Sequence, residues 1–138
     1  MNNHPESPGE RAVKAELEHL GIRYIQEHKI FGLRGDTKAY READFYLPDY
    51  DIYIEYLGEY YKNKKNGDKR YGHKMRVYEN NNIKCIYIYP NQLNYSQKVI
   101  KEGIERYGDN AFDQLRRYRG VDYAVTGGGG LHYVLRYI

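Results

Sequence analysis

Tryptophan is absent from this chain, and the residues that build disulfides and soft-metal sites, cysteine and histidine, are scarce. It has no tryptophan, one cysteine and five histidines among 138 residues. The single Cys85 rules out an internal disulfide, and one cysteine with scattered histidines cannot assemble a Cys/His metal cluster. Because Cys85 lies in the apolar run 83–89, we expect it to be a small buried hydrophobic residue.

Long apolar segments are lacking as well. No stretch reaches the length that a membrane-spanning helix needs, and residues 1–7 lack the apolar core of a signal peptide. The sequence therefore predicts a soluble, intracellular, cytoplasmic protein with no membrane partner. Its length favours one domain that is large enough for a real core.

Tyrosine and local positive charge are what the chain has in excess. There are eighteen tyrosines, and the formal net charge is only +3. Seven lysines and arginines nevertheless gather between Glu59 and Arg76, against two acids. A basic segment of this kind suits a polyanion such as nucleic acid, although a solvated loop is the simpler explanation.

The chain predicts an α/β layered core. Ser7, Pro8 and Glu10 form a helix start with a capping box, and the helix should end at Gly21. Strands are expected at about 22–33, on either side of a turn at 48–50, and at 83–89, with a helix at about 68–81 before the last. The last strand then returns by a helical crossover, which gives a mixed central sheet flanked by helices.

Asp44 and Glu55 are the most informative residues. They lie on the two strands that the turn at 48–50 joins, so a hairpin would bring the two carboxylates near each other. Glu55 lies in the middle of an apolar strand, where a lone carboxylate is costly without a partner. Two adjacent carboxylates repel each other, so a shared divalent cation is expected, and this is the chemistry of metal-assisted phosphodiester cleavage.

The last part of the chain differs in character from the rest. We divide the sequence into a core at 1–93 and a C-terminal elaboration at 94–138, with the question of a separate lobe left open. The pattern predicts helices at 96–107 and 109–118, then a β-hairpin of strands 121–126 and 131–138 around the four glycines 127–130.

The motifs of the core resemble those of the PD-(D/E)xK nuclease superfamily, the restriction-endonuclease-like enzymes, and most closely their small Vsr-like group. The matching segments are Asp44–Pro48, Ile52–Gly58, Lys74–Tyr78 and Ile86–Pro90. The resemblance extends roughly from Glu10 to Leu93. It implies a restriction-endonuclease-like core that binds Mg²⁺, with Mn²⁺ as a possible substitute.

Carried over residue by residue, the resemblance implies that Asp44 and Glu55 are metal ligands, with the carbonyl of Tyr56 as a further oxygen. Glu10 matches the acid that many members place on the first helix, although its capping box is a complete structural explanation by itself.

The chain departs from the family pattern at Leu57, where the standard motif has a lysine. Either another residue has taken over the lysine role or the site is inactive. Lys74 is the first choice because it flanks the inner face of the second helix, with Lys62 and Arg70 as second choices, and a surface lysine is the competing interpretation.

The expected activity is that of a Mg²⁺-dependent DNA endonuclease with Glu10, Asp44, Glu55 and Lys74 as catalytic residues. It could be of homing or mobile-element, repair, junction-resolving or restriction type. A homodimer or higher oligomer would let two sites face a duplex. The alternative is a catalytically inactive nucleic-acid-binding module on the same fold. The expected DNA contacts are Lys62, Lys64, Lys65, Lys69, Arg70, Arg116, Arg117 and Arg119.

Overall fold

The computed structural model describes the backbone of residues 6–59 and 64–119, and the side chains of these ranges except 64–70 and 108–119. The predicted hairpin at 121–138 with its four glycines therefore lies outside the described residues.

The first helix, α1 (Pro8–His19), begins where the sequence predicts. Ser7 is its N-cap, and the capping box is complete because Ser7 Oγ accepts from Glu10 N at 3.1 Å while Glu10 Oε1 accepts from Ser7 N at 2.9 Å. The apolar residues Val13 and Leu17 are fully buried. After the helix, Gly21 has a φ of +70°, a left-handed conformation that glycine adopts without strain.

Four strands form one mixed sheet in the order β1-β2-β3-β4. The strands are β1 (Ile25–Phe31), β2 (Tyr40–Leu47), β3 (Ile52–Tyr56) and β4 (Cys85–Ile88). The first three pair antiparallel, and β4 lies parallel to β3 after the helical crossover. The prediction of an α/β chain with a mixed central sheet and flanking helices is confirmed.

Two helices differ from the prediction in their limits. The crossover helix α2 (Lys64–Asn80) begins at Lys64 rather than at Asp68. A 3-10 turn, η1 (Pro90–Tyr95), which was not predicted, leads into α3 (Ser96–Arg119). Where two helices were expected, α3 is a single helix that continues through Gly108, because an interior glycine costs only about 1 kcal/mol relative to alanine.

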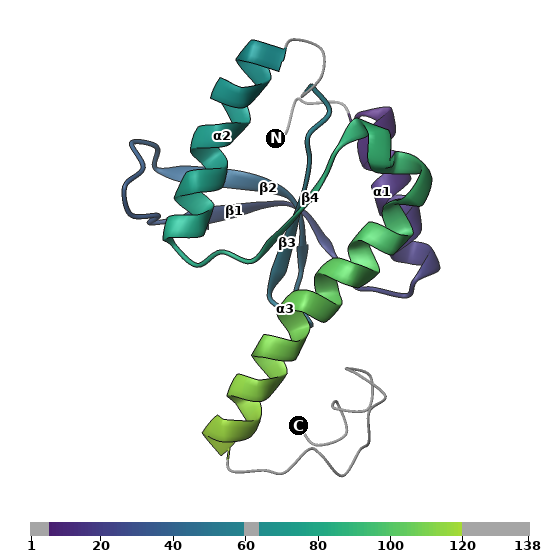
Figure 1. Cartoon of the computed structure of the whole chain (residues 1–138), viewed down its shortest axis with the longest axis vertical. Helices are drawn as coiled ribbons and strands as arrows, with labels where there is room; N and C mark the ends of the chain where they lie inside the picture. Colours follow the sequence, from purple (N-terminus) through teal and green to yellow (C-terminus); the bar gives the residue numbers. More distant parts are fainter. Residues whose placement is uncertain (1–5, 60–63, 120–138) are drawn as a thin grey trace.

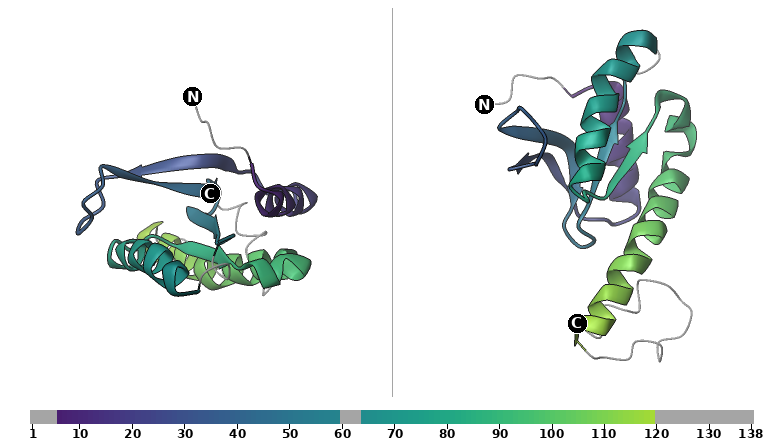
Figure 2. Two further views of the ribbon diagram at one scale, coloured as in Figure 1. Left: turned by 90° about the horizontal axis from the view of Figure 1, so that it is seen from above. Right: turned by 60° about the vertical axis from the view of Figure 1, so that its left-hand side comes forward.

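The helices cover the two faces of the sheet (Figures 1 and 2). One face carries the larger core, in which α1 and α3 pack side by side on β2, β3 and β4. The opposite face carries α2, whose Tyr78 packs with Ile30, Ala43 and Cys85. Ile100 and Ile104 of α3 belong to the larger core. No helix within the described residues is long and apolar enough to span a membrane.

Candidate active site

The register of β2 and β3 brings the two key acids together. Phe45 pairs with Ile54 and Tyr46 with Tyr53, so the next position of this antiparallel ladder sets Asp44 opposite Glu55. Directly opposed residues of two antiparallel strands point to the same face of the sheet. The hairpin therefore presents both carboxylates on one side.

Asp44 and Glu55 line a pocket of about 490 Å³ that also receives residues of α1, α2 and the loop before β2. All four residues predicted to be catalytic take part in it: Glu10, Asp44, Glu55 and Lys74. Leu57 is buried and is not among the lining residues. Among the residues whose side chains are described, the pocket is lined by four acids and three bases, namely Glu10, Asp44, Glu55, Glu59, Lys38, Arg41 and Lys74.

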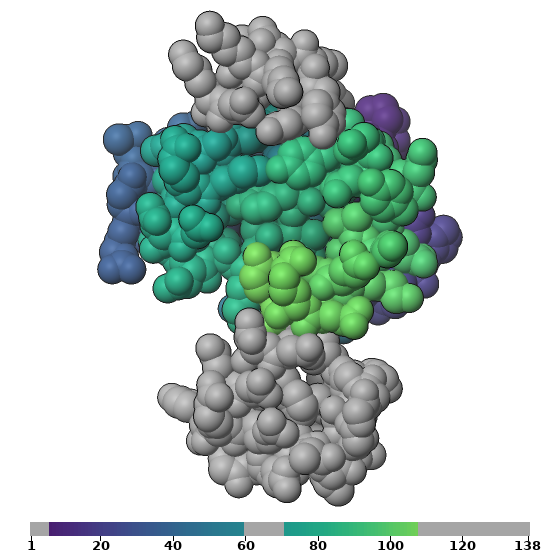
Figure 3. All heavy atoms as spheres, viewed as in Figure 1, coloured from purple at the N-terminus to yellow at the C-terminus, as the bar shows by residue number. Residues whose placement is uncertain are grey.

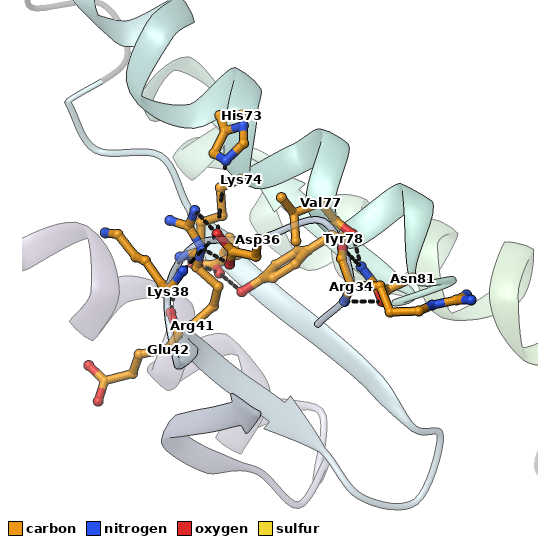
Figure 4. A network of polar contacts seen from close by, with 11 residues as sticks. Arg34, Asp36, Lys38, Arg41, Glu42, His73, Lys74, Val77, Tyr78 and Asn81 are labelled. Atoms are coloured by element: carbon orange, nitrogen blue, oxygen red, sulfur yellow. Dashed lines mark hydrogen bonds and ion pairs between the residues drawn. The ribbon is translucent and has the colours of Figure 1, made fainter. Parts of the chain in front are cut away.

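Glu55 is buried and held by two side chains of α2. Its Oε2 accepts a hydrogen bond from Tyr78 Oη at 2.7 Å and forms an ion pair with Lys74 Nζ at 2.7 Å. Lys74 Nζ also donates to the carbonyl of Glu42 at 3.0 Å, so the amine bridges β3 and β2 (Figure 4). A lysine from the helix thus reaches the motif glutamate, as predicted from the helix face.

The two partners of Glu55 compensate for the burial of its carboxylate. The sequence indicated that a carboxylate in an apolar strand needs a cation, and within the described residues Lys74 supplies that charge while Tyr78 supplies a hydrogen bond. Burial and the nearby Glu55 carboxylate raise the pKa of Tyr78, so its hydroxyl keeps its proton and remains a donor. The burial of Glu55 alone therefore does not require a metal ion.

Asp44 makes the stronger case for a cation. Its Oδ2 accepts from Tyr56 N at 2.7 Å, and this bond favours the charged form. Burial, then the Glu55 carboxylate and then Glu10, outweigh the bond and raise the pKa of Asp44 to about 8. A carboxyl that holds its proton so firmly lies where added positive charge is favoured.

Glu10 belongs both to the capping box and to the pocket. Its Oε1 closes the capping box at the start of α1, and its carboxyl lines the pocket with Asp44, whose pKa it helps to raise. A residue at a helix N-terminus can therefore serve both as a cap and as a third acid of the pocket.

The donors fit a hard divalent cation, although they are not drawn together around one. Among the described residues, no three His, Cys, Asp or Glu side chains are arranged as a ready-made ion site. Within the described part of the chain, Lys74 and Tyr78 both contact Oε2 of Glu55, and the Tyr56 amide contacts Oδ2 of Asp44, so these three partners leave Oε1 and Oδ1 for an ion. Carboxylate oxygens are the ligands that Mg²⁺ and Mn²⁺ prefer.

Sequence reasoning missed the basic side of the pocket. Arg41 and Lys38 line it, and the Arg41 guanidinium donates two hydrogen bonds to the Asp36 carboxylate, at 2.7 and 2.9 Å. Asp36 and Lys38 lie in the polar excursion before β2, and Arg41 lies near the start of β2. The pattern of the excursion gives no sign that it folds back toward α2. The sequence offers no signal for Arg41, because it precedes Asp44 by three residues and the alternation of side chains along a strand would put the two on opposite faces.

The eight predicted DNA contacts all lie outside the described side chains. Lys62 lies outside the described residues. The other seven have a described helical backbone but undescribed side chains: Lys64, Lys65, Lys69 and Arg70 in α2, and Arg116, Arg117 and Arg119 in α3.

Comparison with known proteins adds nothing to this geometry. No protein-family model, curated protein or solved structure matches the chain.

Proposed function

We propose that this protein is a divalent-metal-dependent DNA endonuclease with a restriction-endonuclease-like core. The observation that carries the proposal is the placement of the Lys74 amine 2.7 Å from Glu55, in a pocket that Asp44 also lines. An acid pair on adjacent strands with a lysine beside it is the constellation that the resemblance implies, and here the lysine comes from α2 instead of from β3.

In the proposed chemistry, the acids would bind the cation and Lys74 would act on the attacking water. Asp44 and Glu55 would hold Mg²⁺ or Mn²⁺ through Oδ1 and Oε1, with Glu10 at their side. The bound cation supplies Lewis-acid stabilisation of the negative charge that develops on the phosphate. Lys74 is oriented by Glu55 and by the Glu42 carbonyl, so its amine can position the attacking water or offset charge in the transition state.

A plasmid-nicking assay with Mg²⁺ or Mn²⁺ tests this function. We expect the wild type to nick or cut DNA, and Asp44→Asn and Glu55→Ala to lose at least about 100-fold in rate. Glu42→Gln is the matched control, because Glu42 lies on the same strand as Asp44, is exposed, and contacts Lys74 only through its backbone carbonyl. Figure 4 shows its carboxylate pointing away from the network.

The nicking assay distinguishes a nuclease from a non-catalytic nucleic-acid-binding module. Cleavage that persists in Glu55→Ala would refute the proposed site. DNA binding by the wild type without cleavage in either metal would favour the non-catalytic nucleic-acid-binding module. A homodimer remains a proposal for double-strand cleavage, which sedimentation would test.

A further inference from the structure

Polar contacts join the loop between β1 and β2 to α2 and to the residue that follows it. Asn81, the residue that follows α2, accepts a hydrogen bond from the Arg34 amide at 2.8 Å and donates one to the Arg34 carbonyl at 3.0 Å, and His73 of α2 approaches Asp36 at 3.9 Å. In the space-filling view this loop (blue) lies along the side of α2 (teal), as Figure 3 shows. The loop therefore has a fixed place beside the pocket.

Within this loop, Asp36 holds the Arg41 side chain in one orientation. Arg41 Nε donates to Asp36 Oδ2 at 2.7 Å and Arg41 Nη2 donates to Oδ1 at 2.9 Å. The side chains of both residues are nearly inaccessible to solvent, at 11% and 0% exposed. Asp36 also accepts from the Lys38 amide, at 3.3 Å. A bidentate pair of this kind fixes the plane of the guanidinium.

The fixed guanidinium belongs to the wall of the candidate active site. Arg41 lines the same pocket as Asp44, Glu55 and Lys74, and Lys38 lies beside it (Figure 4). The two bonds to Asp36 use Nε and Nη2, so Nη1 lies outside the clamp. The pocket thus has an acidic side suited to a cation and a basic side suited to an anion.

We propose that Arg41, oriented by Asp36, contacts a backbone phosphate of the DNA that enters this pocket. The inference rests on the proposed function and specifies how the substrate is held. A planar, permanently charged guanidinium matches the oxygens of a phosphodiester, and its prior fixation reduces the entropy lost on binding. Asp36 is a positioning residue, because it acts through Arg41.

The test is the salt dependence of DNA binding, measured by fluorescence anisotropy with a short labelled duplex in EDTA, so that no cleavage interferes. Arg41→Ala should weaken binding about tenfold and should reduce the slope of log affinity against log salt by about 0.9, the value for one lost phosphate contact. A purely structural role for Arg41 would lower the melting temperature and leave this slope unchanged.

Arg23→Ala is the matched control. Arg23 forms a second bidentate pair with Asp49, but that pair is exposed and neither residue lines the pocket. Both variants remove one positive charge and one arginine–aspartate pair, and only the Arg41 variant should change the slope. If Arg41→Ala does not fold, Arg41→Gln keeps a hydrogen-bond donor for Asp36 without the charge, and it should show the same loss of slope.

The possible failures can be told apart. A folded Arg41→Ala or Arg41→Gln variant with the wild-type slope, or an equal loss of slope in Arg23→Ala, overturns the inference. If the wild type then still cuts DNA in the nicking assay, the proposed function stands without it. A wild type that neither binds nor cuts DNA overturns both.

Discussion

At the scale of single residues, the candidate site depends on how one buried carboxylate is compensated. Glu55 is only 4% exposed, and its Oε2 receives both the Lys74 amine and the Tyr78 hydroxyl. Sequence alone could point to Lys74, because its helical spacing from Tyr71 and Tyr78 puts it beside the inner face of α2. The Tyr78–Glu55 bond could not be foreseen, because a tyrosine on an apolar helix face usually only fills the core.

The first prediction concerns this hydrogen bond. Tyr78→Phe should lower the free energy of unfolding by roughly 1.5–3 kcal/mol, because a buried, charged acceptor loses its donor. Urea denaturation measures the change. Tyr107→Phe serves as the control. Among the described side chains and backbone, the Tyr107 hydroxyl makes only a long contact of 3.4 Å with the Cys85 carbonyl, so this substitution should cost less than about 1 kcal/mol. Equal effects of the two substitutions would contradict the role of Tyr78.

The second prediction concerns the protonation of Asp44. Its pKa rises from 3.8 in the unfolded chain to about 8 in the fold, so between these values the folded protein holds a proton that the unfolded chain releases. In metal-free buffer the free energy of unfolding should therefore fall as the pH rises from about 4 to about 8, by at most roughly 1.4 kcal/mol per pH unit from this group.

Thermal or urea melts across that range measure the effect, with Asp44→Asn as the comparison. The asparagine variant should lose most of this decline, and Mg²⁺ at pH 8 should restore stability to the wild type only. A wild-type stability that rises from pH 4 to pH 8 in the same way as the variant's would show that Asp44 is not held in its protonated form.

At the scale of elements, local signals located caps and turns better than they located helix limits that depend on packing. The Ser7 capping box and the turn at 48–50 both act through neighbouring residues, and both are found where they were predicted. Longer-range packing decides where α2 begins and whether α3 continues through Gly108. Residue patterns carry little information on such packing, which explains why those limits were wrong.

The third prediction tests how α1 is seated on the sheet. A Cβ at Gly9 would overlap the Tyr56 ring, so α1 approaches β3 closely next to Glu10. Gly9→Ala should lower the free energy of unfolding by about 1–3 kcal/mol and displace Glu10 from the pocket. Gly72→Ala in α2 is the control, because the nearest atom is the movable end of Arg76 at 3.4 Å, and it should gain up to about 1 kcal/mol.

Urea denaturation measures both variants. A neutral Gly9→Ala would mean that α1 does not rest on Tyr56 in this way, and the placement of Glu10 beside Asp44 would lose its support.

At the scale of the whole molecule, the fold brings three separate segments to one pocket. Glu10 comes from α1, the acid pair from the β2–β3 hairpin, and Lys74 from α2. The hairpin could be predicted because its two strands are neighbours in sequence. The approach of the β1–β2 loop, which carries Asp36, could not, because its contacts with His73 and Asn81 join residues that are far apart in the chain.

The most direct test of the account is a titration of the metal-free protein with Mn²⁺, followed by electron paramagnetic resonance of the unbound ion. We predict a bound ion whose affinity falls at least about tenfold in Asp44→Asn and in Glu55→Gln, because each loses a charged oxygen ligand. Asp49→Asn, which removes an acid outside the pocket, should leave the affinity unchanged. A wild type that binds no Mn²⁺, or one whose affinity falls as much in Asp49→Asn, would contradict the shared-cation site.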